Sequence, residues 1–243
     1  MTDGPVDQDA EAQPVRQGLL GGGVKLLWGE AWPVVVLTAA LWLVFAGQLI
    51  GEALGYDNAI FALGALSRMG LEYGLWWTPL SHMFLHVGWL HIAMNSAALI
   101  ALGPAVAQRL GRDALGGLMF LGFFLICGLA GGAVFLLLAP ANAPAVGASG
   151  AIFGLWGAVA RLAGPGEIKL APLFSRAVGQ QIVSAVVSNL VVVFAAAAFG
   201  LASGVGIIGV AWQAHLGGFV AGILLIQVMP VRFHWLRQPK PAR

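Results

Sequence analysis

Six long apolar segments dominate the pattern of hydrophobic and polar positions along this chain. They are Pro33–Ile50, Val87–Val106, Ala114–Leu138, Ser149–Ala163, Ile182–Leu201 and Ile207–Val231. A helix of about 20 apolar residues crosses a hydrocarbon core of roughly 30 Å. The segments are continuously apolar rather than short and alternating, which predicts helices and argues against a closed β-barrel. We therefore expect an all-α membrane protein with a bundle of six transmembrane helices.

The composition strengthens this prediction. Hydrophobic residues make up 59% of the 243 residues and charged residues 9%, whereas an average soluble domain has about 25% charged residues. The mean hydropathy is +0.88. A single cysteine, Cys127, lies in an apolar run, so the sequence excludes a disulfide framework and a thiolate metal cluster.

The basic residues indicate the orientation of the helices. Only Arg68 falls in a connection on the predicted outer side. An excess of Lys and Arg marks the cytoplasmic connections of membrane proteins, so we expect both termini in the cytoplasm. The eleven basic residues on that side are Arg16, Lys25, Arg109, Arg112, Arg161, Lys169, Arg176, Arg232, Arg237, Lys240 and Arg243.

The domain organisation follows from the same pattern. Residues 1–27 are polar and lack the basic start, apolar core and cleavage site of a signal peptide. We expect a flexible cytoplasmic tail at 1–27, a six-span membrane domain at 28–231 and a basic cytoplasmic tail at 232–243. The longest outer connection, residues 51–86, carries Trp76 and Trp77, which predict a segment that lies on the membrane interface.

Polar groups are costly inside a membrane, so the few that are present are the first candidates for chemistry. No Asp or Glu occurs between Asp113 and Glu167 or after Glu167. A buried carboxylate that orients a histidine is therefore not expected, and an activated serine would have to rely on a Ser–His dyad. Counting along the helices places Ser149 roughly 8 Å and His215 roughly 12 Å below the outer surface. One pocket open to that surface can hold both side chains.

Small residues recur every four positions beside these two side chains. Such stripes let helix backbones approach closely. Ordinary helix packing explains either stripe alone, but a dyad between the two helices also needs this packing. The stripes are Gly150, Gly154 and Ala158 on the fourth segment, and Ala214, Gly218 and Gly222 on the sixth.

His91 and Asn95 share one face of the second segment, four residues apart. Their N–H groups and the backbone N–H of Ser149 are suited to bind a developing oxyanion, and Gly147 permits close backbone approach there. A metal site is the alternative for His91, together with His82 and His86, although the catalytic Glu of zinc-protease motifs is absent.

Together these residues resemble the rhomboid family of intramembrane serine proteases, over about Trp28 to Met229. The resemblance rests on order and spacing across six spans. The matching motifs are His86-x4-His91-x3-Asn95, Gly147-Ala148-Ser149-Gly150 and Ala214-His215-Leu216-Gly217-Gly218. It implies a six-helix rhomboid-like fold without a cofactor.

The resemblance also implies the roles of these residues. Ser149 would attack a peptide carbonyl, and His215 would accept its proton and return it to the leaving amine. His91 and Asn95 would form the oxyanion hole. The supporting residues would be Gly147, Gly150, His86, Phe153 and Gly218.

Two departures from the family pattern concern the outer loop and the aromatic neighbour of the histidine. Trp76-Trp77-Thr78 stands where many members have a Trp-Arg pair, and Phe153 stands where many have Tyr. The dyad itself is intact.

We therefore predict a metal-independent serine endopeptidase of a bacterial cytoplasmic membrane. Its expected partners are single-span membrane protein substrates and the lipid bilayer, with no nucleic acid; the oligomeric state is left open. One alternative is a non-catalytic rhomboid-like protein that binds transmembrane helices. The other is a zinc-dependent membrane enzyme or metal transporter.

Overall fold

The computed structural model describes residues 23–163, 169–202 and 209–232, which form helices joined by loops and two isolated β-bridges. The elements in order are α2 (Gly23–Ala53), α3 (Asp57–Gly64), α4 (Arg68–Glu72), α5 (Thr78–Ser81), the short 3-10 helix η2 (His82–Phe84), α6 (Trp89–Leu110), α7 (Ala114–Leu138), α8 (Ser149–Arg161), α9 (Arg176–Ala202) and α10 (Trp212–Leu225).

The predicted tails lie mostly outside the described residues, which exclude 1–22 and 233–243. The last five residues of the predicted tail 1–27, Gly23 to Leu27, form the start of α2. This helix breaks at Ala31, where φ is −153° and ψ is 51°. Pro33 lies just beyond the break and lacks the N–H of a regular helix. The membrane-crossing part of α2 therefore runs from Ala31 to Ala53.

Four helices are long and apolar enough to cross a membrane, namely Ala31–Ala53, α6, α7 and α9. The helix α7 has the bounds that the hydrophobic pattern predicts. The other two, α8 and α10, have 13 and 14 residues. At 1.5 Å per residue they measure about 20 Å, less than the roughly 30 Å of a hydrocarbon core. Six membrane crossings therefore stay a prediction.

The sixth segment is shorter than predicted. Its helix runs from Trp212 to Leu225, whereas the apolar run extends from Ile207 to Val231. Ala211 instead belongs to a loop and packs in a small cluster that includes Leu66 and Ala145. Apolar character indicates burial in either conformation. Pro230 closes the apolar run at the other end, where it cannot continue a helix.

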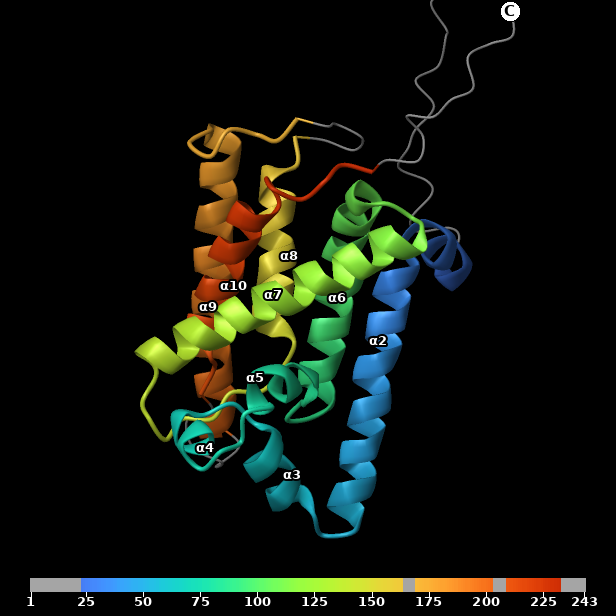
Figure 1. Cartoon of the computed structure of the whole chain (residues 1–243). Coiled ribbons are helices and arrows are strands. Elements are labelled where there is room, and N and C mark those ends of the chain that lie inside the picture. Colours follow the sequence, from blue (N-terminus) through green and yellow to red (C-terminus); the bar gives the residue numbers. More distant parts are fainter. Residues whose placement is uncertain (1–22, 164–168, 203–208, 233–243) are drawn as a thin grey trace, which may run out of the picture.

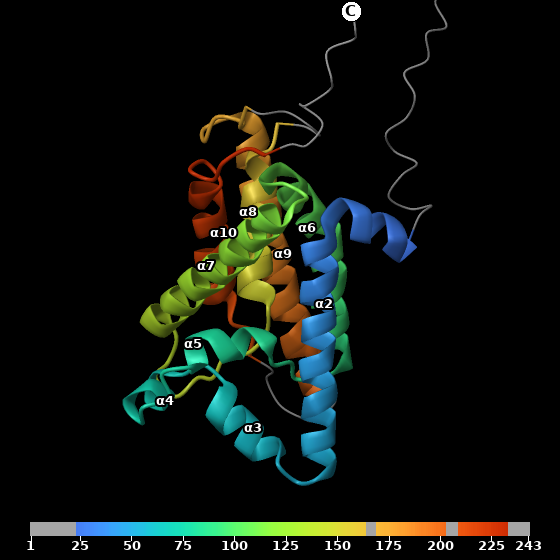
Figure 2. The same ribbon diagram turned by 45° about the vertical axis from the view of Figure 1, so that its right-hand side comes forward.

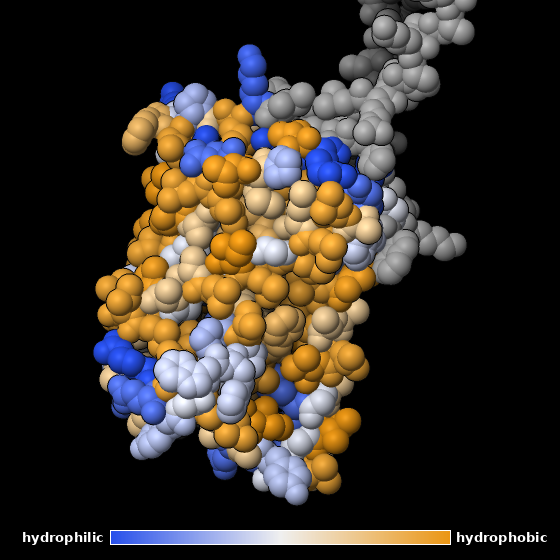
Figure 3. Space-filling view, in the orientation of Figure 1, coloured by the Kyte–Doolittle hydropathy of each residue, from blue (hydrophilic) through white to orange (hydrophobic). Residues whose placement is uncertain are grey.

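The helices form one bundle around α8 and α10 (Figure 1). The helices α2 and α6 pack along each other, and α7 crosses obliquely over α8 and α10 (Figure 2). The short elements α3 to η2 gather at the end of the bundle where α8 and α10 begin. An apolar band surrounds the middle of the visible face, and hydrophilic residues collect toward both ends (Figure 3). The chain is an integral membrane protein.

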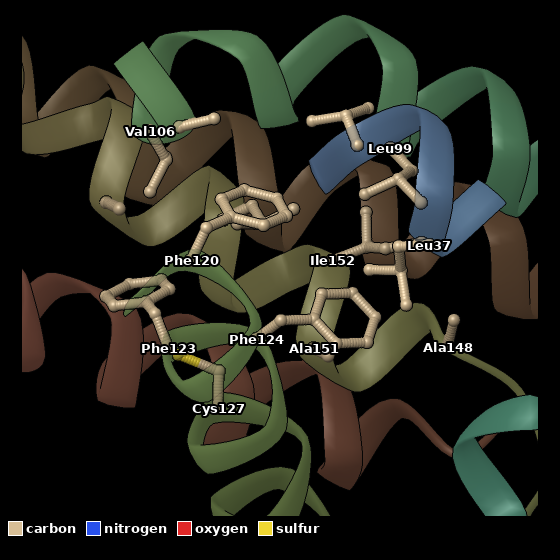
Figure 4. Packing of buried hydrophobic residues seen from close by; sticks show 14 of the residues in the cluster. Leu37, Leu99, Val106, Phe120, Phe123, Phe124, Cys127, Ala148, Ala151 and Ile152 are labelled. Carbon is tan, nitrogen blue, oxygen red and sulfur yellow. The ribbon is translucent and has the colours of Figure 1, made fainter. Parts of the chain in front are cut away.

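The central core lies where α7 meets α2, α6 and α8 (Figure 4). Lipid tails are as apolar as leucine, so close packing rather than water exclusion holds membrane helices together. Phenylalanine rings from one face of α7 fill the space between the helices. The core includes Leu37, Leu99, Phe120, Phe123, Phe124 and Ile152, each at most 4% exposed.

The connection between α2 and α6 packs against the end of α7. Arg68 donates hydrogen bonds to the carbonyl oxygens of Leu136 and Ala139, at 2.6 and 3.0 Å. These carbonyls belong to the last turn of α7, where helical partners are missing and the helix dipole favours a cation. Arg68 therefore caps the C-terminal end of α7.

Candidate active site

Ser149 is the first residue of α8, and a tightly held loop presents it. Gly147 donates its backbone N–H to the carbonyl of His82 at 2.8 Å. Its φ is +114°, a conformation that glycine adopts without strain. A Cβ at this position would lie only 2.6 Å from Cε1 of His91. Both backbone conformation and space therefore require the glycine that precedes Ser149.

His215 lies in the first turn of α10 and meets Ser149 directly. The distance between His215 Nε2 and Ser149 Oγ is 2.8 Å. Phe153 lies one turn after Ser149, and its ring stacks on the imidazole at a centroid distance of 4.3 Å, with parallel planes. The structure thus brings together the two side chains that helix counting places at similar depth. Phe153 supplies the aromatic face without a hydroxyl.

The two small-residue stripes face each other along α8 and α10. A Cβ on Gly218 would collide with the carbonyl oxygen of Gly150, and a Cβ on Gly222 with that of Gly154. The predicted close approach of these helices is confirmed. Because the two backbones touch, Ser149 and His215 are held at a distance that neither helix can change alone.

Asn189 of α9 is the neighbour of the histidine that sequence reasoning missed. Its Oδ1 lies 2.8 Å from His215 Nδ1, on the side of the ring away from Ser149. A carboxylate is the usual partner that orients a catalytic histidine, and the chain has none after Glu167. An amide inside the fifth apolar segment was the available signal, since intramembrane polar groups seek partners.

The predicted oxyanion residues line the same loop. A Cβ on Gly147 would lie 2.7 Å from His91 Nε2 and 3.6 Å from Asn95 Nδ2, so both side chains abut the loop that carries Ser149. Asn95 Nδ2, His91 Nδ1 and His86 Nε2 are buried without a hydrogen-bond partner within the described residues. Buried polar atoms are rarely left unsatisfied, so such atoms indicate a place for water or a ligand.

His86 is fixed from the side of α2. Gln48 donates to the carbonyl of His86 at 3.1 Å and accepts from its backbone N–H at 3.0 Å. This clamp was not predicted, because Gln48 lies near the end of an apolar segment. The His86 and His91 rings meet edge to face at 5.0 Å.

The ring of His82 contacts the backbone of α5, one turn earlier in the chain. Its Nδ1 lies 2.9 Å from the carbonyl of Thr78. In the part of the chain that the structure describes, no three His, Cys, Asp or Glu side chains are grouped so that they can hold a metal ion.

A small pocket lies beside Ser149. Backbone and small side chains form most of its wall, and His82 contributes a polar group. Its lining includes Ala145, Gly147, Gly150, Ala211 and Ala214. The pocket adjoins a hydroxyl in contact with an imidazole, which is the pairing that nucleophilic catalysis uses.

The profile of the Rhomboid domain matches residues 73–231, a range that contains every site residue described above except Gln48. The chain belongs to the rhomboid family. The rhomboid protease GluP of Bacillus subtilis (strain 168) is 31% identical over 165 residues, which cover 68% of this chain.

Two further relatives cover shorter stretches of this rhomboid. The putative rhomboid protease YdcA of Bacillus subtilis (strain 168) is 31% identical over 124 residues, and RHOMBOID-like protein 5 of Arabidopsis thaliana 39% over 98 residues. These alignments cover 51% and 40% of this chain. The chain matches 28% of the length of GluP, 57% of YdcA and 30% of the Arabidopsis protein.

Proposed function

We propose that this rhomboid is an intramembrane serine endopeptidase that cleaves transmembrane proteins in or near their membrane span. The observation that carries the proposal is the 2.8 Å separation of Ser149 Oγ and His215 Nε2 beside a pocket. A hydroxyl within hydrogen-bond reach of a neutral imidazole is the arrangement that activates a serine. The relatives named as rhomboid proteases support the same activity.

The reaction proceeds in two stages. In the first, Ser149 Oγ attacks the carbonyl carbon of the scissile bond while its proton passes to His215 Nε2. The tetrahedral intermediate collapses as His215 returns this proton to the leaving amine, and an acyl-enzyme remains. In the second stage, His215 takes a proton from water as that water attacks the ester. The second tetrahedral intermediate collapses as His215 gives this proton to Ser149 Oγ, which frees the serine and the acid product.

The oxyanion of each intermediate is bound by Asn95 Nδ2, a ring N–H of His91 and the backbone N–H of Ser149. Asn95 Nδ2 is buried and without a partner within the described ranges. The Ser149 N–H lies in the first helical turn, where no intrahelical acceptor exists. Removing one such donor from a protease typically costs about 10²–10³ in kcat.

The same proposal includes the topology and the substrates. All six apolar helices cross or enter the membrane as the domain 28–231, and both tails, 1–27 and 232–243, lie in the cytoplasm. The short α8 and α10 keep the dyad below the outer surface, where water reaches it. The substrates are single-span membrane proteins, and the membrane is the bacterial cytoplasmic membrane.

The proposal is tested by labelling the purified full chain in detergent with a fluorophosphonate probe, which reacts only with an activated serine. Labelling is expected for wild type and for Ser184→Ala, a matched control at an exposed serine of α9. Ser149→Ala and His215→Ala should lose labelling and keep their helical content. Labelling retained in Ser149→Ala, or folded wild type that does not label, would overturn the mechanism and favour a non-catalytic helix-binding protein.

A further inference from the structure

Asn189 links α9 to the first turn of α10 through both ends of its side-chain amide. Its Oδ1 lies 2.8 Å from His215 Nδ1, and its Nδ2 donates to the carbonyl oxygen of Trp212 at 3.4 Å. The residue lies midway along α9, within an otherwise apolar stretch. One side chain therefore contacts both the imidazole and the backbone that carries it.

The second contact settles which way the amide points. A carbonyl oxygen only accepts hydrogen bonds, so the NH₂ group of Asn189 faces Trp212 and its oxygen faces His215. Since that oxygen also only accepts, His215 Nδ1 must carry the ring proton. Nε2 is then left with a lone pair directed at the hydroxyl of Ser149. The donors and acceptors thus run in one direction from Ser149 through His215 and Asn189 to Trp212.

Two further contacts explain what the amide adds. The parallel ring of Phe153 fixes the plane of the imidazole but still permits a half-turn about the Cβ–Cγ bond, which keeps the plane and exchanges the two edges of the ring. The hydrogen bond to Asn189 removes this rotation, because only one orientation aligns Nδ1 with Oδ1 and Nε2 with Ser149. An amide holds the imidazole in this orientation without a charge, whereas a carboxylate would place a charge in the membrane.

We propose that Asn189 is a positioning residue that sets the tautomer and the orientation of His215. The site then works as a Ser149–His215–Asn189 relay rather than as an isolated dyad. This inference rests on the proposed serine endopeptidase activity and adds to it a residue from a third helix.

The rival explanation is that Asn189 merely attaches α9 to the bundle. The chain contains a control for this, because Trp156 Nε1 donates to Gln181 Oε1 at 2.9 Å, two turns earlier on the same helix. Gln181→Ala removes an attachment of α9 without touching His215. Asn189→Ala removes an attachment together with the partner of Nδ1.

The experiment measures the rate of fluorophosphonate labelling against pH for wild type, Asn189→Ala, Asn189→Asp and Gln181→Ala, with Ser149→Ala as blank. Asn189→Ala should label about 10- to 100-fold more slowly, within the roughly 10²–10⁴ that a general base contributes. Gln181→Ala should label at the wild-type rate. Asn189→Asp should restore labelling, with the acid limb of its profile moved to higher pH, because a carboxylate favours the charged imidazole.

The outcomes separate the two proposals. If wild type labels and Asn189→Ala labels as fast as Gln181→Ala, Asn189 is structural and the relay is wrong, while the endopeptidase stands. If wild type itself does not label, the endopeptidase fails first. If Asn189→Ala does not fold, Asn189→Leu takes its place, because leucine fills a similar space without an acceptor for Nδ1. Labelling of that variant as fast as Gln181→Ala would show that Asn189 is structural.

Discussion

The contact of α8 with α10 and the attachment of α9 are built in opposite ways. Between α8 and α10, glycines bring backbone against backbone, so that even one added carbon at Gly218 has no space. In α9, only 6% of the apolar window is buried, and two polar side chains, Gln181 and Asn189, tie it to its neighbours. The corresponding buried share is 44% in α6 and 39% in α7.

This difference separates the parts of the site by rigidity. Ser149 and His215 lie on the two helices that cannot move apart without breaking a continuous contact. Of the four long apolar helices, α9 has the smallest buried share, and Asn189 lies on it. Helices that bury little surface open most readily. The nucleophile and base are thus fixed by the bundle, whereas the residue that aligns the base depends on where α9 sits.

The largest effect is expected from a substitution in the close contact between α8 and α10. Gly218→Ala forces a Cβ into the carbonyl oxygen of Gly150, and such overpacking costs about 1–3 kcal/mol of unfolding free energy. Thermal unfolding in detergent should show a lower midpoint, with loss of probe labelling. Gly122→Ala is the matched control, because its Cβ meets no atom within 4 Å and alanine favours a helix by about 0.5–1 kcal/mol. Equal effects in both variants would contradict the tight contact.

A smaller effect is expected from a substitution that weakens the attachment of α9. Gln181→Ala removes the hydrogen bond from Trp156, and such interhelical bonds average about 0.6 kcal/mol. Amide hydrogen exchange should rise roughly threefold in the neighbouring turns of α9 and stay unchanged in α8. Gln180→Ala changes the adjacent exposed glutamine and should leave both helices as they are. Equal acceleration in α8 would mean that α9 is not independently held.

The smallest effect concerns the far end of α10. Asp113 accepts from the backbone N–H of Gly116 and pairs with Arg232, which follows α10. The Gly116 N–H and the Arg232 guanidinium lower the pKa of this carboxyl. Since the folded pKa lies below the unfolded value of about 3.9, the stabilisation is present above that pH and is lost as the pH falls through the folded pKa.

The stabilisation by Asp113 is measured by thermal unfolding at several pH values. The range runs from about pH 5 to about pH 3, which brackets the unfolded pKa. The midpoint of wild type should fall more steeply with acid than that of Asp113→Asn. Arg232→Ala should give an intermediate slope, because the Gly116 N–H remains. Identical slopes in wild type and Asp113→Asn would show that the ionised Asp113 does not stabilise the fold. The effect is small because the pair is exposed and screened.

Much of the fold was predictable because its causes are local in the sequence. Continuous apolar runs predicted the helices, and the four-residue spacing of glycines predicted which faces of α8 and α10 meet. Counting along the helices predicted similar depths for Ser149 and His215, because each depth depends only on the helical rise per residue. The family is shown by a match over residues 73–231.

The misses arise where distant segments meet. The sixth apolar segment includes Ala211, which lies in a loop before α10, because hydropathy indicates burial and not backbone conformation. Asn189 and Gln48 were visible as amides in apolar segments. Their partners are 26 and 38 residues away along the chain, and no periodicity relates them.

The absence of carboxylates from the helices α6, α7, α8, α9 and α10 has an electrical consequence. Before reaction, the hydroxyl, the imidazole and the two asparagine amides of the proposed site are all uncharged. Moving one charge through the whole membrane is worth about 2.3 kcal/mol per 100 mV. Proton transfer from Ser149 to His215 separates charge over only 2.8 Å of a core about 30 Å thick. Voltage therefore alters the barrier by roughly 0.2 kcal/mol per 100 mV at most, and the chemical step proceeds nearly alike in energised and de-energised membranes.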